Sequence, residues 1–540
     1  MPKIIIDERE IACRDGAPVL QAAIEAGWDV PHYCYHPGLS VVASCRLCLM
    51  EMKLPHPKTH EMDWAPKLFP SCQTPVRDGM EVRFDSDKVR VNQRNCMEFF
   101  LIDHPLDCPV CDQAGECYLQ DYSRDFGNAT SRMVEQKHVN PKKNIGSKTL
   151  LYQDRCVMCT RCVRFTREVT GTRELCVVNR GHHDEIDVFP GEPLENKLQG
   201  NVVDLCPVGA LLDKDFLFAQ RVWYLSRTPS VCPGCSTGCT IDIDHNEGRI
   251  HRVKPRYNPE VNDWWICDDG RFGWKYVHDM DRLTTPRVRR GDRVEPIAWK
   301  DLPGLLSFRF AQVAGDDQGR QVAVVLSPMM SCEEAWLLIR FMREVASRST
   351  LVLGPVPVAG NDECFPAGAT NGDTRFTIRS EKCPNRRGIE HLIEQAGGRT
   401  ERFDDFVERC AAGEVAGVWI TGGYPTDWTT KELTAALAKP ELLVVQDLVE
   451  TALTEHAEVV IPSCMFAERD GTFMNHAGLL QAFERAVPPP AGVQRDGQIL
   501  FAAAGFEGLY SGRRVREMMA EEMPAFAEVY APPALPEHQH

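Results

Sequence analysis

The sequence predicts a chain of several domains, α+β in its first half and α/β in its second. Three observations predict this fold class. The chain has 540 residues, which is enough for three to five domains with sizeable cores. Of its 23 cysteines, 18 precede residue 268 and fall into spaced groups among short predicted strands and helices. Beyond residue 320, short apolar runs alternate with helical stretches, which is typical of an open, mostly parallel sheet.

Composition and charge argue against several classes of protein. Hydrophobic residues make up 43% and charged residues 26% of the chain, which is the composition of an ordinary globular protein. The net charge of −16 argues against a nucleic-acid-binding protein, which usually presents a basic face. The sequence has no run of 18 apolar residues and opens without a signal-peptide pattern. We therefore expect a cytoplasmic protein that reaches a membrane only through partner subunits.

The spacing of the cysteines indicates metal or cluster ligation. Small secreted proteins use dense cysteines for disulfides, but this chain is long and shows no export signal. Scattered buried thiols are the plainer alternative. That alternative does not explain four groups that each contain a C-x2-C pair.

The first group follows a predicted strand–strand–helix unit. The strands are expected at 3–6 and 10–13 and the helix at 18–26, which Gly27 ends. The spacing of the cysteines is C-x10-C-x2-C-x23-C. Plant-type ferredoxins have a shorter first gap but the same logic, in which three cysteines of one loop and one distant cysteine hold a [2Fe–2S] cluster. The candidate ligands are Cys34, Cys45, Cys48 and Cys72.

The second group has only three cysteines, with the spacing C-x2-C-x5-C. Three thiolates leave a [4Fe–4S] cluster one ligand short, and a histidine lies four residues upstream. A capping or surface role is the alternative for that histidine. The incomplete cysteine set favours ligation, and an imidazole ligand should raise the reduction potential. The candidate ligands are His104, Cys108, Cys111 and Cys117.

The third group is C-x2-C-x2-C with a remote Cys-Pro pair, the bacterial ferredoxin arrangement. Cys176 competes as fourth ligand by distance alone, but the Cys-Pro pair favours Cys206. The candidate ligands of this [4Fe–4S] cluster are Cys156, Cys159, Cys162 and Cys206. Four arginines accompany the loop, either as a solvated helix face or as compensation for thiolate charge or a subunit contact: Arg155, Arg161, Arg164 and Arg167.

The fourth group has the spacing C-x2-C-x3-C-x27-C, which suffices for another [4Fe–4S] cluster. A structural zinc ion is the alternative, because four cysteines also suit Zn²⁺. The spacing favours the cluster. The candidate ligands are Cys232, Cys235, Cys239 and Cys267.

The second half carries no further ligand pattern. Buried parallel strands are expected at 322–326, 350–353, 416–420, 442–446 and 458–461, with a helix at 332–345. Gly422 and Gly423 would lie at the carboxyl end of a strand, where doubly wound sheets bind ligands, although a tight turn explains them equally simply. Five cysteines lack ligand spacing and are expected to be core or surface thiols: Cys332, Cys364, Cys383, Cys410 and Cys464.

With these groups in order, the chain resembles the large iron–sulfur (G, or 75-kDa) subunit of NADH:quinone oxidoreductase, respiratory complex I, in a bacterial short form. The resemblance is dense over the first 285 residues. The segments that carry it are Cys34 to Pro37, Cys45 to Cys48, His104 to Cys117, Arg155 to Glu168, Asp204 to Leu211 and Trp265 to Phe272. Two later segments echo the molybdopterin oxidoreductases: Cys383 to Gly388 and Asp470 to Asn475.

The resemblance implies the ligand sets given above and a division into five parts. These would be a β-grasp [2Fe–2S] ferredoxin-type domain, a [4Fe–4S] domain with one histidine and three cysteine ligands, a ferredoxin-like [4Fe–4S] region, a [4Fe–4S] domain of the molybdopterin-oxidoreductase type, and a truncated molybdopterin-oxidoreductase-like α/β domain without cofactor. The corresponding ranges are 1–80, 81–125, 126–220, 221–285 and 286–540.

The resemblance also implies an electron relay without a catalytic residue of its own. Its cofactors would be one [2Fe–2S] and three [4Fe–4S] clusters, without molybdopterin, and in this family the fourth cluster lies off the main electron path. Electrons would arrive from an NADH-oxidising flavin subunit and leave through other cluster-bearing and connecting subunits toward quinone. The proton-translocating complex would hold the chain peripherally, on the cytoplasmic face of the inner membrane, and no nucleic acid would be involved.

Some features depart from the family. Ser44 stands where the family usually has glycine, an inserted stretch rich in His, Pro and Lys lies between Cys48 and Cys72, and only about 255 residues follow the fourth cluster domain, which is expected to end at residue 285. A molybdenum or tungsten formate dehydrogenase is the alternative function, but no Cys-His pair occurs after residue 285. An iron-only hydrogenase is disfavoured because the chain has no adjacent cysteines.

Overall fold

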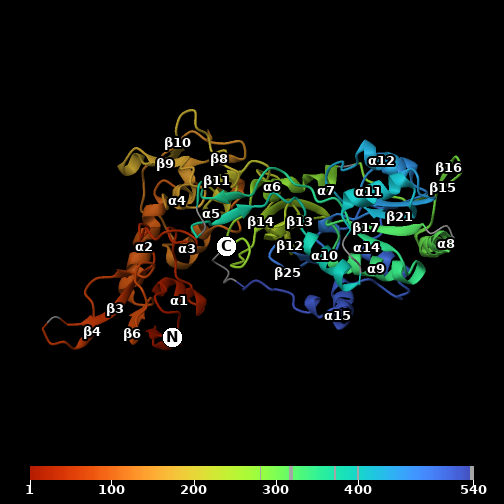
Figure 1. The fold of residues 1–540 in the computed structure, drawn as a ribbon. Coiled ribbons are helices and arrows are strands. Elements are labelled where there is room, and N and C mark those ends of the chain that lie inside the picture. The colour runs from red at the N-terminus through yellow and green to blue at the C-terminus, as the bar shows by residue number, and fades with distance from the viewer. Residues whose placement is uncertain (57, 280, 316–319, 370–371, 398–400, 535–540) are drawn as a thin grey trace.

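The computed structural model describes residues 1–56, 58–279, 281–315, 320–369, 372–397 and 401–534. Figure 1 shows the cysteine-bearing first half on one side, the C-terminal α/β domain on the other, and the sheet β12–β14 between them. Among the helices in the described ranges, none is both long and apolar enough to cross a membrane.

The N-terminal domain is a mixed sheet packed against one helix. Its strands run in the order β2-β1-β6-β3-β4, with β5 beside β3. Buried Ile4 and Ile6 of β1 pack against Val19 and Leu20 of the helix, so the predicted strand–strand–helix unit is confirmed. The elements are β1 (Lys3–Ile6), β2 (Arg9–Ala12), α1 (Val19–Glu25), β3 (Leu49–Pro55), β4 (Met62–Trp64), β5 (Phe69–Pro70) and β6 (Met80–Arg83).

Two features extend this domain. β6 pairs in parallel with β1 and antiparallel with β3, so the sheet continues through the expected boundary at residue 80 to Arg83. The inserted stretch between Cys48 and Cys72 contains the β3–β4 hairpin, which projects from the molecule in Figure 1.

Short helices and small sheets carry the second and third groups. α2 begins after Ser86, whose Oγ accepts a hydrogen bond from Val89 N at 3.3 Å, and α2 packs against α3. A three-stranded sheet, β11-β8-β7, and the hairpin β9–β10 follow. The elements are α2 (Asp87–Leu101), η1 (Cys108–Val110), α3 (Tyr118–Phe126), β7 (Lys143–Asn144), β8 (Thr149–Leu151), η2 (Gln153–Arg155), α4 (Arg161–Glu168), β9 (Leu175–Val178), η3 (Gly181–His183), β10 (Glu185–Val188), α5 (Asn201–Leu205), β11 (Leu211–Asp213) and η4 (Val222–Tyr224).

The fourth group lies at one end of an antiparallel meander, β12-β13-β14. One continuous hydrophobic core contains cysteines of all four groups, from Cys34 to Cys267. The loops that carry the cysteine groups therefore share one packed core. The elements of the fourth region are β12 (Ser226–Val231), β13 (Thr240–Asn246), β14 (Arg249–Pro255), α6 (Asp268–Phe272), η5 (Gly273–Lys275) and α7 (Tyr276–Asp279).

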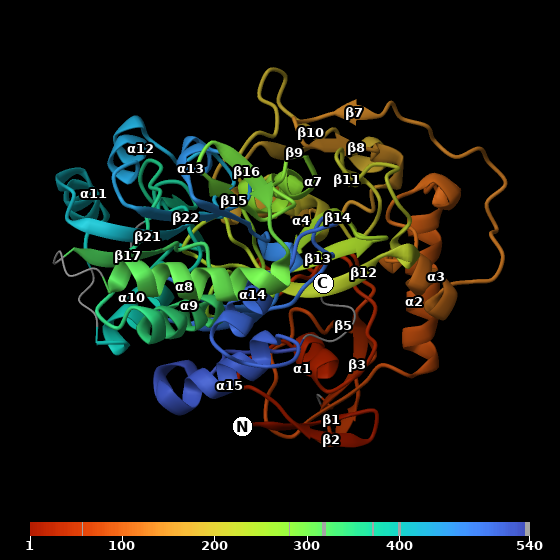
Figure 2. The ribbon, with the colours of Figure 1, turned by 90° about the vertical axis from the view of Figure 1, so that its right-hand side faces the viewer.

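A seven-stranded sheet forms the C-terminal domain, in the order β16-β15-β23-β22-β21-β17-β18. The five consecutive strands from β23 to β18 are parallel, as the sequence predicts, while β15 and β16 add an antiparallel edge. Along β17, Val324 faces the core that contains α8, α9 and α14, and Val325 faces the core that contains α11 and α12. Figure 2 shows helices on both faces of the sheet, the doubly wound arrangement.

The predicted strands and the predicted helix at 332–345 of this domain are confirmed to within a residue or two at each end. Two hairpins, β19–β20 and β24–β25, extend toward the fourth group. The strands are β15 (Arg287–Arg290), β16 (Arg293–Pro296), β17 (Gln321–Leu326), β18 (Thr350–Leu353), β19 (Glu363–Phe365), β20 (Phe376–Ile378), β21 (Val415–Thr421), β22 (Leu442–Asp447), β23 (Val459–Pro462), β24 (Gly471–Met474) and β25 (Leu480–Phe483). The helices are η6 (Trp299–Asp301), α8 (Leu302–Ala314), α9 (Cys332–Val345), α10 (Arg386–Gln395), α11 (Phe403–Ala412), α12 (Lys431–Leu437), α13 (Ala452–His456), η7 (Phe466–Glu468), α14 (Asp496–Ala503), α15 (Gly512–Glu522) and η8 (Pro524–Phe526).

The glycine pair after β21 forms a turn that a carboxylate fills. Gly423 has a φ of +88° and donates its N–H to Asp447 Oδ1 at 2.9 Å. A Cβ at Gly422 would overlap the same carboxyl group. Trp428 Nε1 donates to Asp447 Oδ2 at 2.9 Å. The geometry is that of a tight turn packed by Asp447.

Candidate iron–sulfur cluster sites

The first cysteine group lies in loops around the N-terminal sheet. Cys34, Cys45 and Cys48 belong to the connection between α1 and β3, and Cys72 follows β5; all four are buried. Hydrogen bonds with the Cys45 and Cys72 thiols lower the pKa of Cys34, and a hydrogen bond with Cys72 lowers that of Cys48. The four sulfur atoms therefore converge. Tyr33 N also donates to Cys45 Sγ at 3.5 Å, the kind of contact that tunes a cluster ligand.

The second group surrounds η1 and the start of α3. Burial raises the pKa of Cys117 to about 12 and lowers that of His104 to about 4, so both are uncharged without a metal. The charges of Cys108 and Cys111 raise the pKa of Cys117 further, which places these three thiols near one another. In the described part of the chain, His104 Nδ1 is buried without a hydrogen-bond partner. A buried nitrogen without a partner costs free energy unless something binds it, which fits a ligand role.

The third group is built around the first turn of α4. The charge of Cys206 acts on the pKa of each of the other three thiols, whereas Cys176 on β9 donates to Asp187 O at 3.5 Å. Burial raises the pKa of Cys206, while hydrogen bonds from backbone N–H groups of Val208, Ala210 and Leu211 lower it. This turn aims its amides at the sulfur, and the geometry favours Cys206 over Cys176.

Three of the four arginines beside the third group are buried. Arg161 donates to Leu205 O at 3.4 Å and to Tyr35 O, and Arg164 donates to Cys159 O at 3.2 Å and to Cys34 O. Their charges lower the pKa of Cys159, which burial raises to about 11. Arg167, in contrast, is 54% exposed and pairs with Glu168. Charge compensation of the third group therefore holds for Arg161 and Arg164, and a solvated position for Arg167, while buried Arg155 pairs with Asp107.

The fourth group spans the end of β12, the start of β13 and the N-terminus of α6. Cys232 N donates to Cys239 O at 2.8 Å, and Gly270 N donates to Cys267 Sγ at 3.4 Å. Burial raises the pKa of Cys239, and the charges of the three other thiols of the group raise it further, so the four thiols lie close together. A Cβ at Gly270 would lie 3.1 Å from Cys232 Sγ.

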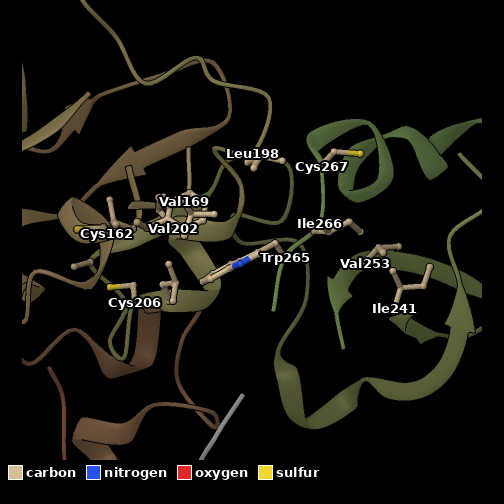
Figure 3. Close-up of a cluster of buried hydrophobic side chains, with 14 of the residues drawn as sticks. Cys162, Val169, Leu198, Val202, Cys206, Ile241, Val253, Trp265, Ile266 and Cys267 are labelled. Carbon is tan, nitrogen blue, oxygen red and sulfur yellow. The ribbon is translucent and has the colours of Figure 1, made fainter. Parts of the chain in front are cut away.

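Aromatic residues lie between the groups. Burial raises the pKa of Tyr33, and thiols from three different groups add to the effect: Cys45, Cys117 and Cys159. Trp265 is buried and packs against Phe165 of α4, with ring centroids 5.1 Å apart. Figure 3 shows the Trp265 indole between the Cys162 and Cys206 side chains and Cys267. Sequence reasoning missed both residues, although Tyr33 adjoins Cys34 and Trp265 lies two positions before Cys267.

The donor sets fit iron–sulfur chemistry. Thiols gathered in threes and fours, all buried except Cys108 and the partly buried Cys156, are with one imidazole the ligands that these clusters use, and binding would displace the thiol protons. Within the described residues, no group of three or more His, Cys, Asp or Glu side chains is arranged to hold a single metal ion. In a cubane cluster each ligand bonds a different iron atom. When bound, such clusters accept and release single electrons.

Five known family profiles match successive parts of the chain. They are the 2Fe-2S iron-sulfur cluster binding domain at 3–87, the NADH-ubiquinone oxidoreductase-G iron-sulfur binding region at 93–132, the ferredoxin-like domain of NADH-quinone oxidoreductase subunit 3 at 146–212, the Molybdopterin oxidoreductase Fe4S4 domain at 225–279, and Molybdopterin oxidoreductase at 394–505. The predicted fold class is thereby confirmed, and 2Fe-2S and 4Fe-4S binding domains are present.

Curated relatives that align over about two thirds of the chain are subunits of NADH-quinone or NADH-ubiquinone oxidoreductases. The G subunit of NADH-quinone oxidoreductase from Rickettsia felis is 34% identical over 352 residues, which are 65% of this chain and 50% of that protein. The NADH-ubiquinone oxidoreductase 75 kDa subunit of Reclinomonas americana is 33% identical over 377 residues, 69% of this chain and 52% of that protein. This chain thus spans about half the length of the curated relatives it matches. A chain of the NAD+-reducing [NiFe]-hydrogenase in its H2-reduced state matches with a TM-score of 0.35 and 25% identity, over 41% of this chain and 91% of that one.

Proposed function

We propose that this chain, a homologue of the iron–sulfur G (75-kDa) subunit of NADH:quinone oxidoreductases over about two thirds of its length, is an electron-relay subunit of such a complex. The ligands would be the four sets described above, for one [2Fe–2S] and three [4Fe–4S] clusters. Electrons would enter from an NADH-oxidising flavin subunit and leave through other cluster-bearing subunits toward quinone. The chain would have no catalytic site and no molybdopterin of its own.

The observation that carries the proposal is the convergence of three ligand groups on Tyr33. One thiol from each of the first three groups lies close enough to this buried phenol to raise its pKa. Single-electron transfer needs rigidly held sites that lie close together and away from water. The chain supplies that rigidity through Arg161 and Arg164, which join the loop of the first group to that of the third.

The alternative of a formate dehydrogenase is not favoured, because the relatives that align over about two thirds of the chain are named as NADH-quinone oxidoreductase or NADH dehydrogenase proteins. Under the proposal, the proton-translocating activity belongs to the assembled complex. The chain would lie peripherally, on the cytoplasmic face of the inner membrane, held there by its partner subunits. The five-part division into 1–80, 81–125, 126–220, 221–285 and 286–540 is part of the proposal, with its first boundary moved to follow Arg83, where the N-terminal sheet ends.

The test is the content of iron, acid-labile sulfide, zinc, molybdenum and tungsten per chain after anaerobic purification. The proposal expects roughly 14 iron and 14 sulfide, from one binuclear and three cubane clusters. About one molybdenum or tungsten per chain would overturn it in favour of the formate dehydrogenase. Roughly 10 iron with one zinc would replace the fourth cluster by a structural zinc ion.

A further inference from the structure

The loop between Cys235 and Cys239 is held by the C-terminal domain. Its three intervening carbonyl groups, those of Ser236, Thr237 and Gly238, all accept hydrogen bonds from the β24–β25 hairpin. Ser236 O accepts from His476 N at 2.9 Å, Thr237 O from Asn475 Nδ2 at 3.2 Å, and Gly238 O from Gln481 Nε2 at 2.8 Å. The donors lie more than 230 positions along the chain from their acceptors.

Two hydrogen-bond donors of the same loop also bond residues of the C-terminal domain. Ser236 N donates to Glu381 O at 2.9 Å, and Thr237 Oγ1 donates to Thr377 O at 3.0 Å. Buried polar groups must be paired, and here distant residues pair most of them. Locally the loop has a turn bond from Gly238 N to Cys235 O at 3.3 Å, and most of its other polar groups bond the C-terminal domain, which therefore sets much of its conformation.

Gln481 joins the two segments that carry the fourth group. While its Nε2 donates to Gly238 O, its Oε1 accepts from Asn258 Nδ2 at 3.2 Å. Asn258 O in turn accepts from Asp263 N at 2.7 Å and so closes the turn that leads to Cys267. Gln481 is 2% exposed and Asn258 is fully buried.

Asn475 is oriented by its own turn. Its Oδ1 accepts from Ala477 N and Leu479 N, both at 3.0 Å, which directs Nδ2 to Thr237 O. The contact is close: Gly238 has a φ of +67°, and a Cβ there would lie 3.0 Å from Asn475 Cβ. The hairpin and the cysteine loop are thus fitted to each other.

We infer that the β24–β25 hairpin forms the second wall of the fourth cluster site, with Asn475 and Gln481 as positioning residues that hold the Cys235–Cys239 loop for the cluster. The inference rests on the proposed function, since it presupposes a cluster at this site. It gives the C-terminal domain a role that needs no cofactor of its own. A ligand loop whose carbonyls are engaged elsewhere keeps its sulfur atoms at fixed positions, as a cluster requires.

Three substitutions test the inference on the full chain. Gln481→Met keeps the volume of the side chain and removes both amide contacts. Asn475→Asp keeps the acceptor that closes the turn and removes the donor to Thr237 O. Gln446→Met is the matched control, because Gln446 is a buried amide of the same domain that bonds Trp419 and Asp496 and does not touch the loop.

Iron and sulfide content, and electron paramagnetic resonance of the reduced protein, give the readout. In Gln481→Met we expect about four iron and four sulfide fewer per chain than in the wild type, with the signals of the other three clusters unchanged. In Asn475→Asp we expect the fourth cluster to stay but its reduction potential to fall, because the new carboxylate opposes an added electron. A shifted potential is an effect that general loosening of the domain would not produce.

The outcomes separate the inference from the proposed function. A full complement of about 14 iron and an unchanged fourth signal in Gln481→Met would overturn the inference and leave the proposed function intact. Loss of the fourth cluster in Gln446→Met as well would also overturn it, since any damage to the domain would then suffice. A wild-type chain without a fourth cluster would refute that part of the proposed function, and the inference with it.

Discussion

Arg155 donates two hydrogen bonds to one carboxylate oxygen of Asp107, from Nε at 3.1 Å and from Nη2 at 2.8 Å. Asp107 immediately precedes Cys108 of the second group, and Arg155 immediately precedes Cys156 of the third. Arg155 also donates to Gly209 O at 3.3 Å, and a Cβ at Gly209 would overlap Cys111 Sγ. This ion pair therefore fixes the spacing of two neighbouring candidate cluster sites.

Replacing Arg155 by methionine should destabilise both sites. Its side chain is 2% exposed, so the loss leaves Asp107 without its partner beside the second group. Breaking a fully buried pair costs about 3–5 kcal/mol, and because Asp107 is 37% exposed we expect about 1–3 kcal/mol here. The measurement is the thermal transition of the anaerobic protein together with the resonance signal of the second cluster, which should weaken.

Arg167→Met is the control for that experiment, since Arg167 is exposed and its pair with Glu168 should be worth less than about 0.5 kcal/mol. Equal effects of the two substitutions would show that the Arg155–Asp107 pair has no special role in the spacing of the sites.

Much of this architecture is readable from the sequence because its signals are local. Cys-x-x-Cys pairs, the Cys206-Pro207 step and the period of the helix at 332–345 each lie within one short stretch of chain. The alternation of strands and helices after residue 320 is likewise sufficient to predict the parallel sheet. Each of these features depends on neighbours in the sequence, so no tertiary information is needed.

What the sequence does not reveal depends on partners far along the chain. Asp107 and Arg155 are 48 positions apart, and Gly238 and Gln481 are 243 apart. No periodicity or spacing connects such pairs, because their contact exists only once the domains have packed. The same reason explains why β15 and β16 could not be assigned to the edge of a sheet whose next strand, β23, begins at Val459.

Substitution of His104 should change either the reduction potential or the iron content of the second cluster, depending on the replacement. In His104→Cys a thiolate replaces a neutral imidazole, so the added negative charge should lower the reduction potential while the iron content stays the same. In His104→Ala the cluster should lose a ligand and be depleted by up to about four iron atoms per chain. A redox titration followed by electron paramagnetic resonance measures both effects.

His183→Cys provides the matched control, because His183 is exposed in η3 and outside the four ligand sets. If His104→Ala kept the full iron content and the wild-type potential, His104 would be a buried histidine without a ligand role.

Oxidative damage should begin at the second site. Cys108 is exposed, whereas the other candidate ligand cysteines are buried or, for Cys156, partly buried. Its neighbours Leu106 and Val110 are 87% and 54% exposed, so this loop is the most open of the candidate ligand loops to an oxidant. During treatment of the isolated chain with ferricyanide we expect the signal of the second cluster to disappear first. Loss of the fourth cluster before the second would contradict this order.

The stability of the C-terminal domain should depend on pH through Glu333. This carboxyl group lies in α9 without exposed surface, and burial raises its pKa from 4.5 to about 7. Hydrogen bonds from Thr472 N at 2.7 Å and Thr472 Oγ1 at 3.0 Å, and Arg516 Nη1 at 3.6 Å, act in the opposite direction but do not cancel the effect of burial. Between pH 4.5 and about pH 7, the folded chain therefore holds a proton on Glu333 that the unfolded chain releases.

The sign follows from that proton. A raised carboxyl pKa contributes stability below about pH 4.5, and the contribution is lost as the pH rises through about 7, by an amount on the order of 3 kcal/mol. Glu333→Gln keeps the shape of the side chain and cannot ionise. Its melting temperature relative to the wild type should therefore rise between pH 5 and pH 8, by about 5 °C for a domain of this size. Glu344→Gln, an exposed position of the same helix, should show no such trend. A difference between Glu333→Gln and the wild type that stays constant from pH 5 to pH 8 would mean that Glu333 is already ionised in the folded protein at pH 5, and that Arg516 and Thr472 outweigh its burial.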